Sequence, residues 1–298
     1  MGAAAQNTLA APVTLQGVGL HSGIDCRITV SPADPGEGVL FERTDLLNGA
    51  RQHRFIKISP DRVTATSLGT TISNQHGVSV ATIEHLMAGL ALCGVDNAII
   101  QVSGPEIPIC DGSAYEFVAA FEGVGIKSQA STRRPISVNR SIAVTDDDRQ
   151  LTIEPLDYLR LDVAIDFDDC AIGRQSLTVS TENAEDCKRL AASRTFCRLR
   201  DVEAMRSAGL IKGGSLENSI VVDGDQLLNG AQLRDDHEFA LHKALDLIGD
   251  LYLLGGPIQG HIIAHKPGHD INNRFAREIA RVTAFDAETV ISPVAASA

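Results

Sequence analysis

Hydrophobic and polar residues alternate over short stretches in the first third of the chain, a pattern typical of half-buried β-strands. Turn-forming residues separate these stretches, which cover 24–30, 38–43 and 54–58. From residue 80 to residue 93 the apolar positions recur three or four residues apart, which predicts a helix that ends at Gly94. The apolar stretch 97–102 then predicts a buried strand.

The second half of the chain repeats this order in outline. Strands are predicted at 136–144, 150–154, 161–167, 219–222 and 258–264, and helices at 182–192, at 235–254 and from about 271. Because strands precede helices in each half, we expect an α+β fold of two similar domains, each a sheet layered with helices, as after a duplication. The polar segment 127–134 is predicted to be a linker between domains 1–126 and 135–298.

Two lines of residues run along the helix predicted at 235–254. One line is apolar, and the other carries His242, Asp246 and Asp250 at steps of four residues, which places them on one face. An imidazole and a carboxylate one turn apart supply two ligands of a zinc tetrahedron, and a catalytic zinc site needs one more protein ligand and an open position. A solvated surface line without any ligand fits this pattern equally well.

Two further groups of residues are candidates for the missing ligand. Glu84 and His85 are adjacent in the helix predicted at 80–93, where His85 suits a metal and Glu84 suits a nearby water, although such a dipeptide is more often a surface feature. His261 and His265 share one face of a predicted strand and are best interpreted as ordinary strand residues. His269 follows a Pro-Gly break in a loop, where functional groups tend to be placed.

Composition narrows the classes of partner. The net charge of −12 argues against nucleic acid, which is bound mainly through phosphate neutralisation. A small anionic substrate needs only a local basic patch, for which the candidates are Arg194, Arg198, Arg200, Lys243 and Lys266.

Composition also bears on location. No apolar run approaches the ~20 residues of a membrane-spanning helix, and the first residues lack the basic region of a signal peptide. The cysteines are scattered without a CxxC pair, which favours reduced thiols and a cytoplasmic protein; they are Cys26, Cys93, Cys110, Cys170, Cys187 and Cys197.

Seven motifs, in order along the chain, resemble those of the UDP-3-O-acyl-N-acetylglucosamine deacetylases. They are GVGLHSG at 17–23, ATIEHL at 81–86, PEIPICDGS at 105–113, SRTF at 193–196, GSL at 214–216, HKALDLIGD at 242–250 and GH at 268–269. This family is one of zinc-dependent amidases that remove the acetyl group of UDP-3-O-acyl-N-acetylglucosamine during lipid A biosynthesis in Gram-negative bacteria. The resemblance implies two similar α/β sandwich domains facing each other across the active site.

The resemblance also implies a role for each matching residue. The zinc ligands would be His85, His242 and Asp246. Glu84 resembles the general base and His269 the general acid, with Asp250 as the carboxylate that orients and charges His269. The substrate-facing residues would be Thr195 as an oxyanion donor, Lys243 as a cation and Phe196 as a binding residue.

These residue types suit the hydrolysis of an acetamide, which needs a strong nucleophile, stabilisation of the oxyanion and a proton for the leaving nitrogen. Zinc supplies the first by lowering the pKa of water from ~16 toward ~7. A bell-shaped pH profile is expected, with Glu84 on the acid limb and His269 on the alkaline limb.

The fatty chain of the substrate requires an apolar channel. Its wall is predicted within 196–211, and its apolar residues there are Phe196, Leu199, Val202, Met205 and Leu210. An ordinary amphipathic insertion fits this segment as well.

The implied partners are this UDP-sugar, a transient contact with the inner membrane surface and no second protein chain. Two other classes of function remain open from the residues themselves. One is a related zinc hydrolase acting on another acylated amine or ester, and the other is a protein whose zinc only clamps two domains together.

Overall fold

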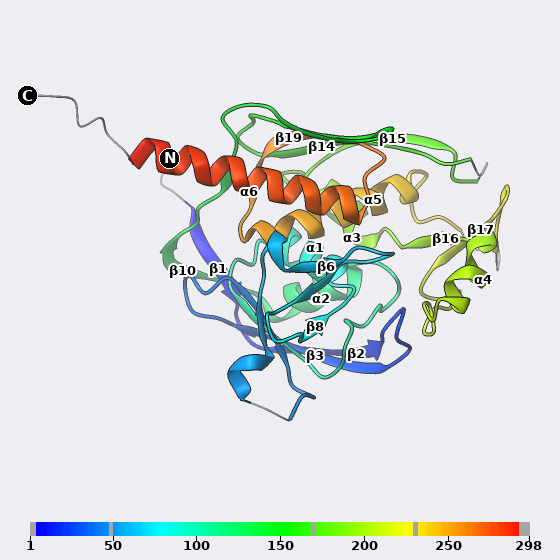
Figure 1. The fold of residues 1–298 in the computed structure, drawn as a ribbon, viewed down its shortest axis with the longest axis horizontal. Helices are drawn as coiled ribbons and strands as arrows, with labels where there is room; N and C mark the ends of the chain where they lie inside the picture. The colour runs from blue at the N-terminus through cyan, green and yellow to red at the C-terminus, as the bar shows by residue number, and fades with distance from the viewer. Residues whose placement is uncertain (1–3, 48–49, 169–170, 229–231, 292–298) are drawn as a thin grey trace, which may run out of the picture.

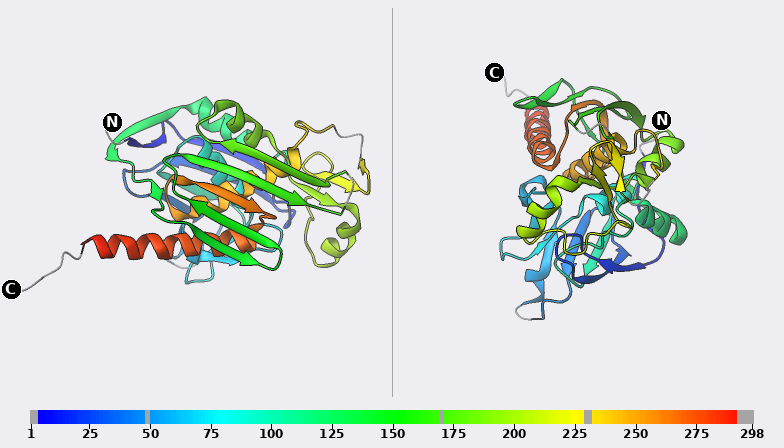
Figure 2. Two further views of the ribbon diagram at one scale, coloured as in Figure 1. Left: turned by 90° about the horizontal axis from the view of Figure 1, so that it is seen from above. Right: turned by 90° about the vertical axis from the view of Figure 1, so that its right-hand side faces the viewer.

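A computed structural model describes residues 4–47, 50–168, 171–228 and 232–291. Two sheets form the outer layers and the main helices lie between them (Figure 1). The right-hand view in Figure 2 shows the second sheet on one side of the helices and the strands of the first half on the other side. The α+β class predicted from the sequence is confirmed.

The two large sheets have the same strand order. The first is ordered β2 (Val13–Val18), β3 (Asp25–Pro32), β9 (Ala98–Val102), β4 (Val39–Arg43) and β5 (Phe55–Lys57). The second is ordered β12 (Ile142–Asp146), β13 (Arg149–Glu154), β19 (Ile258–His265), β14 (Leu159–Asp166) and β15 (Arg174–Ser180), with β11 (Ile136–Ser137) also paired to β19. In each sheet the central strand is parallel to one neighbour and antiparallel to the other, so the two halves share a topology.

The helices follow the same repeat. They are α1 (Glu84–Leu92), α2 (Tyr115–Val124), α3 (Ala184–Ala192), α4 (Leu199–Ser207), α5 (Glu238–Leu251) and α6 (His269–Ile291). Helix α1 directly precedes β9 in the chain and α5 precedes β19. In each half, therefore, the helix that faces the other half comes before the central strand of the sheet. These two helices pack against one another and join the two hydrophobic cores.

Close packing of α1 on α5 depends on Gly249. A Cβ added there would overlap the carbonyl oxygen of Glu84 and crowd the backbone of Ala88. A glycine is unfavourable inside a helix unless a close approach requires it, and here the backbone of α1 occupies the space of the missing side chain.

Each half also carries a small three-stranded sheet. In the first half it is formed by β6 (Val63–Ala65), β7 (Thr71–Ser73) and β8 (Ser79–Val80). Two 3-10 turns precede it in the chain, η1 (Arg51–Arg54) before β5 and η2 (Pro60–Arg62) before β6. In the second half it is formed by β16 (Phe196–Arg198), β17 (Ile220–Asp223) and β18 (Gln226–Leu227). This second insertion projects with α4 at one end of the molecule (Figures 1 and 2).

Two elements differ from the sequence predictions. The predicted linker 127–134 is largely a strand, β10 (Ile126–Thr132), which pairs antiparallel with β1 (Ala5–Leu9). Its polar composition has a physical reason, since a two-stranded sheet with one exposed strand needs few large apolar side chains. The helix predicted from residue 80 begins at Glu84, because Thr82 has a φ of 55° that a right-handed helix does not accept.

Other expectations concern features outside these elements. Five cysteines are free thiols, as predicted, and Cys170 lies outside the described residues. Within the described ranges, every helix is too short or too polar to span a membrane. The domain limits 1–126 and 135–298 stay predictions.

Candidate active site

Three side chains from the two facing helices converge at the centre of the molecule. His85 lies in the first turn of α1, whereas His242 and Asp246 lie one turn apart on α5. The Nε2 atoms of His85 and His242 are 3.5 and 3.4 Å from Oδ1 of Asp246. A tetrahedral zinc ion with ligands at ~2.0–2.1 Å separates its ligand atoms by about 3.3 Å, so this spacing fits a metal.

The surroundings of these groups also fit a metal. Oδ1 of Asp246 is buried and has no hydrogen-bond partner in the described part of the chain, which is costly for a carboxylate oxygen unless a cation binds it. Burial lowers the pKa of His242 to about 3, so its imidazole is neutral. Its Nδ1 lies 3.1 Å from the carbonyl oxygen of Ser193, which leaves Nε2 as the free ligand atom.

Burial rules out the surface interpretation of the helix line. His242, Asp246 and Asp250 each expose no more than 2% of their surface, and in α5 every residue except Lys243 is buried. Such a polar line inside the protein requires partners for each group. The structure therefore favours the metal-site hypothesis over a solvated face.

Glu84 is the first residue of α1 and points toward the same centre. Its Oε2 accepts a hydrogen bond of 2.9 Å from the backbone N–H of Thr70, and its Oε1 lies 3.9 Å from Nε2 of His269. Burial raises the pKa of Glu84, while the charges of His269 and His85 oppose that rise. A carboxylate with a raised pKa is a better proton acceptor near neutral pH.

His269 begins α6 and forms a second buried charge pair. Its Nδ1 lies 2.9 Å from Oδ2 of Asp250, which also accepts a hydrogen bond of 2.9 Å from Nδ2 of Asn272. Burial of His269 lowers the pKa of its imidazole. The negative charges of Asp250 and Glu84 outweigh this effect and raise that pKa to about 9. At neutral pH His269 therefore carries a proton on Nε2, the atom that faces the metal-site residues.

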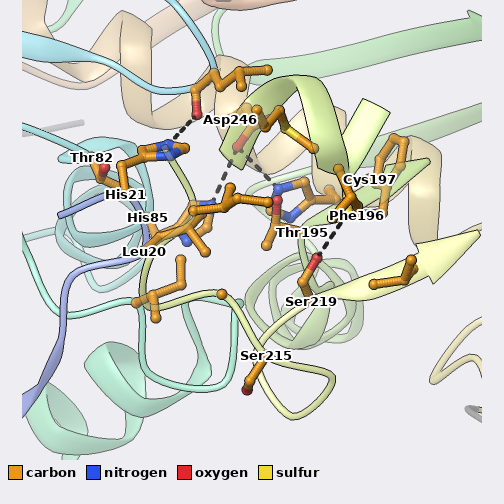
Figure 3. A pocket seen from close by; sticks show the side chains of 18 of the residues that line it. Leu20, His21, Thr82, His85, Thr195, Phe196, Cys197, Ser215, Ser219 and Asp246 are labelled. Carbon is orange, nitrogen blue, oxygen red and sulfur yellow. Dashed lines mark hydrogen bonds and ion pairs between the residues drawn. The ribbon is translucent and has the colours of Figure 1, made fainter. Parts of the chain in front are cut away.

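A cavity of about 290 Å³ opens beside these groups. Residues from both halves line it, including His85, Asp246, Thr195 and Phe196 (Figure 3). In Figure 3 the side chains of His85 and Asp246 point toward one another, and Thr195 and Phe196 lie on the side of the insertion. Of the apolar wall predicted within 196–211, Val202 and Met205 line the cavity with Phe196, whereas Leu199 and Leu210 do not.

Of the five candidates for a basic patch, Lys243 alone lines the cavity. Its ammonium is hydrogen-bonded to Oδ2 of Asp246 at 2.9 Å. Carboxylates bind the other four candidates elsewhere, which are Arg194 with Glu238, Arg198 with Asp201, Arg200 with Asp168 and Lys266 with Asp148. Only the Arg198–Asp201 pair, three residues apart, could have been inferred from sequence spacing. Arg206, which was not among the candidates, lines the cavity.

Sequence reasoning also missed Thr70. Its backbone binds Glu84, and its hydroxyl donates a hydrogen bond of 2.5 Å to Oδ1 of Asp250. Thr70 therefore connects Glu84, the predicted base, to Asp250, which pairs with the predicted acid His269. A threonine in a loop gives no local signal. Asn272 lies three residues after His269 in α6, a spacing that places both side chains on one helix face and could have marked Asn272 as a neighbour of the site.

The strand histidines behave as predicted. His261 and His265 lie on β19 and are not part of the group His85, His242 and Asp246. His261 is hydrogen-bonded to Asp162 at 2.7 Å. His269, by contrast, joins the site.

This fold and this site are those of a hydrolase of the metalloenzyme class, with a possible metal-binding triad, a buried carboxylate and a protonated imidazole around one cavity. A family model described as LpxC, UDP-3-O-acyl N-acetylglycosamine deacetylase, matches residues 6–281. The chain therefore belongs to this deacetylase family.

Individual relatives agree with the family model. The UDP-3-O-acyl-N-acetylglucosamine deacetylase of Phenylobacterium zucineum is 42% identical over 275 residues, covering 92% of this chain and 93% of that protein. The protein of the same name from Myxococcus xanthus is 41% identical over 274 residues, covering 92% and 86%. That of Acidithiobacillus ferrooxidans is 42% identical over 276 residues, covering 92% and 89%.

Proposed function

We propose that this protein hydrolyses the N-acetyl group of UDP-3-O-acyl-N-acetylglucosamine, releasing acetate and UDP-3-O-acyl-glucosamine, in lipid A biosynthesis. Family membership over residues 6–281 supports the substrate. The observation that carries the chemistry is the meeting of a metal triad, Glu84 and His269 at one buried centre. Water adds to the amide carbon, the C–N bond breaks, and the nitrogen leaves as an amine.

Zinc is the metal we propose, held by His85, His242 and Asp246. When bound, it would act as a Lewis acid that polarises the amide carbonyl and acidifies water. Two imidazoles and one carboxylate are a ligand set that leaves a fourth position for substrate or water. All three residues line the cavity, so a zinc ion that they held would be accessible from it.

Two proton transfers are assigned to the flanking residues. Glu84 takes a proton from the attacking water, for which its burial and raised pKa are suited. His269, whose pKa is raised to about 9, gives a proton to the leaving nitrogen. Thr70 holds Glu84 and Asp250 in a fixed relation, so the base and the partner of the acid keep their spacing.

The remaining assigned residues would bind substrate. Thr195, which lines the cavity, would donate a hydrogen bond to the carbonyl oxygen as it gains negative charge. The ammonium of Lys243 lies 5.5 Å from the ring centroid of Phe196, so cation and ring would present one polar and one apolar surface to the substrate. The apolar lining that includes Val202, Met205 and Ile211 suits the acyl chain.

The cellular setting follows from the same proposal. A cytoplasmic enzyme, monomeric and in transient contact with the inner membrane surface, would meet a substrate that carries a nucleotide and a fatty chain.

The direct test measures zinc content and UDP-sugar deacetylation in the parent protein and in His242→Ala. The parent should bind about one zinc per chain and release acetate, and His242→Ala should lose most of both, since one of three ligands is gone. Full zinc and full rate in His242→Ala would refute the mechanism. Faster turnover of simple acetamides than of the UDP-sugar would instead favour a hydrolase of another substrate.

A further inference from the structure

Glu238 is a buried carboxylate that takes no part in the proposed chemistry. It is the first residue of α5 and is fully enclosed. Its Oε1 accepts hydrogen bonds from the backbone N–H and from Nε of Arg194, at 3.1 and 2.8 Å. Its Oε2 accepts from Nη2 of Arg194 at 3.0 Å and from the backbone N–H of Arg234 at 2.7 Å.

The bond to the backbone of Arg194 has a consequence for His242. The N–H of Arg194 and the C=O of Ser193 belong to one planar peptide unit and point in opposite directions. Glu238 holds the N–H, while the C=O meets Nδ1 of His242 at 3.1 Å. Glu238 and His242 are four residues apart on α5, so a single helix holds both ends of one peptide unit.

We propose that Glu238 and Arg194 are positioning residues that set the orientation of the His242 imidazole through the Ser193–Arg194 peptide. Arg194 is thus assigned to the metal site and not to an anionic substrate. The same peptide leads directly into Thr195, whose N–H binds the carbonyl oxygen of Gly112 at 2.7 Å. This inference rests on the metal site of the proposed function.

The physical basis is the geometry of an imidazole ligand. A carbonyl oxygen that accepts the Nδ1 proton fixes both the tautomer and the ring angle, and so directs the Nε2 lone pair. Loss of such a partner typically weakens metal binding about 10–100-fold. A charged, two-pronged contact with Arg194 resists rotation of the peptide better than a single neutral bond does.

A neighbouring ion pair provides the matched control. Arg189 of α3 binds Asp235, just before α5, with Nε 2.8 Å from Oδ2. It too connects a preceding segment to the start of α5, but its hydrogen bonds within the described residues are with Asp235 and Asp186 and not with the 193–195 backbone. Loss of this pair should affect stability without affecting the imidazole.

The experiment measures zinc affinity of the metal-free protein by competition with a chelator, in the parent, Glu238→Gln, Arg194→Gln and Arg189→Gln. We expect a loss of about 10–100-fold in Glu238→Gln and Arg194→Gln, and a change of less than about twofold in Arg189→Gln. Cobalt-substituted Arg194→Gln should also show altered visible bands, since these report ligand geometry, and cobalt-substituted Arg189→Gln should not.

Unchanged zinc affinity in Glu238→Gln, or an equal loss in Arg189→Gln, would overturn the proposal. If Glu238→Gln does not fold, Arg194→Lys is the decisive variant. It keeps the backbone hydrogen bond and a cation beside Glu238, so its zinc affinity should fall less than that of Arg194→Gln. An equal fall in zinc affinity in both variants would refute the positioning role of Arg194. Failure of the parent to bind zinc would count against the proposed function itself. If the parent binds zinc and deacetylates the substrate while Glu238→Gln and Arg194→Gln keep the parental zinc affinity, only this inference is removed.

Discussion

Helices α1 and α5 occupy equivalent places in the two halves but supply site residues in different ways. α1 contributes Glu84 and His85, which are adjacent in sequence at its first turn. α5 contributes His242, Asp246 and Asp250 at steps of four residues along one buried face. Adjacent residues on a helix project about 100° apart, whereas residues four apart project from one face.

This difference separates two tasks. The line on α5 forms a continuous polar strip that runs from the metal triad to the partner of His269. The pair on α1 divides at once, with His85 directed to Asp246 and Glu84 directed to Thr70 and His269. The proposed metal ligand and the proposed proton acceptor are therefore neighbours in the chain that contact different groups.

The sharpest test of this division compares Glu84→Ala with His85→Ala. Glu84→Ala should keep zinc and lose about 10²–10⁴-fold in kcat, because only a general base is removed. His85→Ala should lose the metal itself. Metal analysis and steady-state kinetics on both proteins provide the measurement, and loss of zinc in both would mean that α1 does not divide the tasks.

A second test concerns the contact between the two helices. Gly249→Ala should lower the free energy of unfolding by about 1–3 kcal/mol, because its Cβ would push against the backbone of α1 at Glu84. Gly123→Ala on α2 is the control, since a Cβ there meets nothing within 4 Å and should be neutral or stabilising by up to ~1 kcal/mol. Denaturant unfolding measures both, and equal values would show that the helices tolerate a wider spacing.

The smallest expected effect is a change in pH profile. Asp250→Asn removes the charge that raises the pKa of His269, so that pKa should fall by about one unit or more. Since His269 must be protonated to act as the acid, the alkaline limb of kcat/KM should move to lower pH. Asp270→Asn is the control, because that carboxylate is 55% exposed beside His269 and solvent screens it. A parental alkaline limb in Asp250→Asn would exclude Asp250 as the charging partner.

The two halves also differed in how far the sequence predicted them. The line on α5 was visible because a helical period connects its members, yet its burial was not, since a polar line fits a surface equally well. Glu84 and His85 carried almost no local signal, and only the tertiary packing of α1 on α5 brings them to His242. The fold class followed from the order of strands and helices, which depends on local patterns.

Contacts between residues distant in sequence were the part that the sequence left open. Thr70 reaches Asp250 across 180 positions, and Arg194 reaches Glu238 across 44. No periodicity encodes such pairs, so the pairing of Arg194 with Glu238 was not foreseen when Arg194 was named as a candidate for a basic patch. The strand β10 within the segment 127–134 was not foreseen for a related reason, because β10 takes its pairing partner from the first strand of the chain.

The assembly of the triad from both halves has a thermodynamic consequence. A metal ion that takes His85 from one half and His242 and Asp246 from the other is a ligand of the docked arrangement only. Metal affinity and docking affinity are then linked, and each strengthens the other by the same factor. Neither half is expected to hold the ion alone, so occupancy of the centre reports that α1 and α5 are in register.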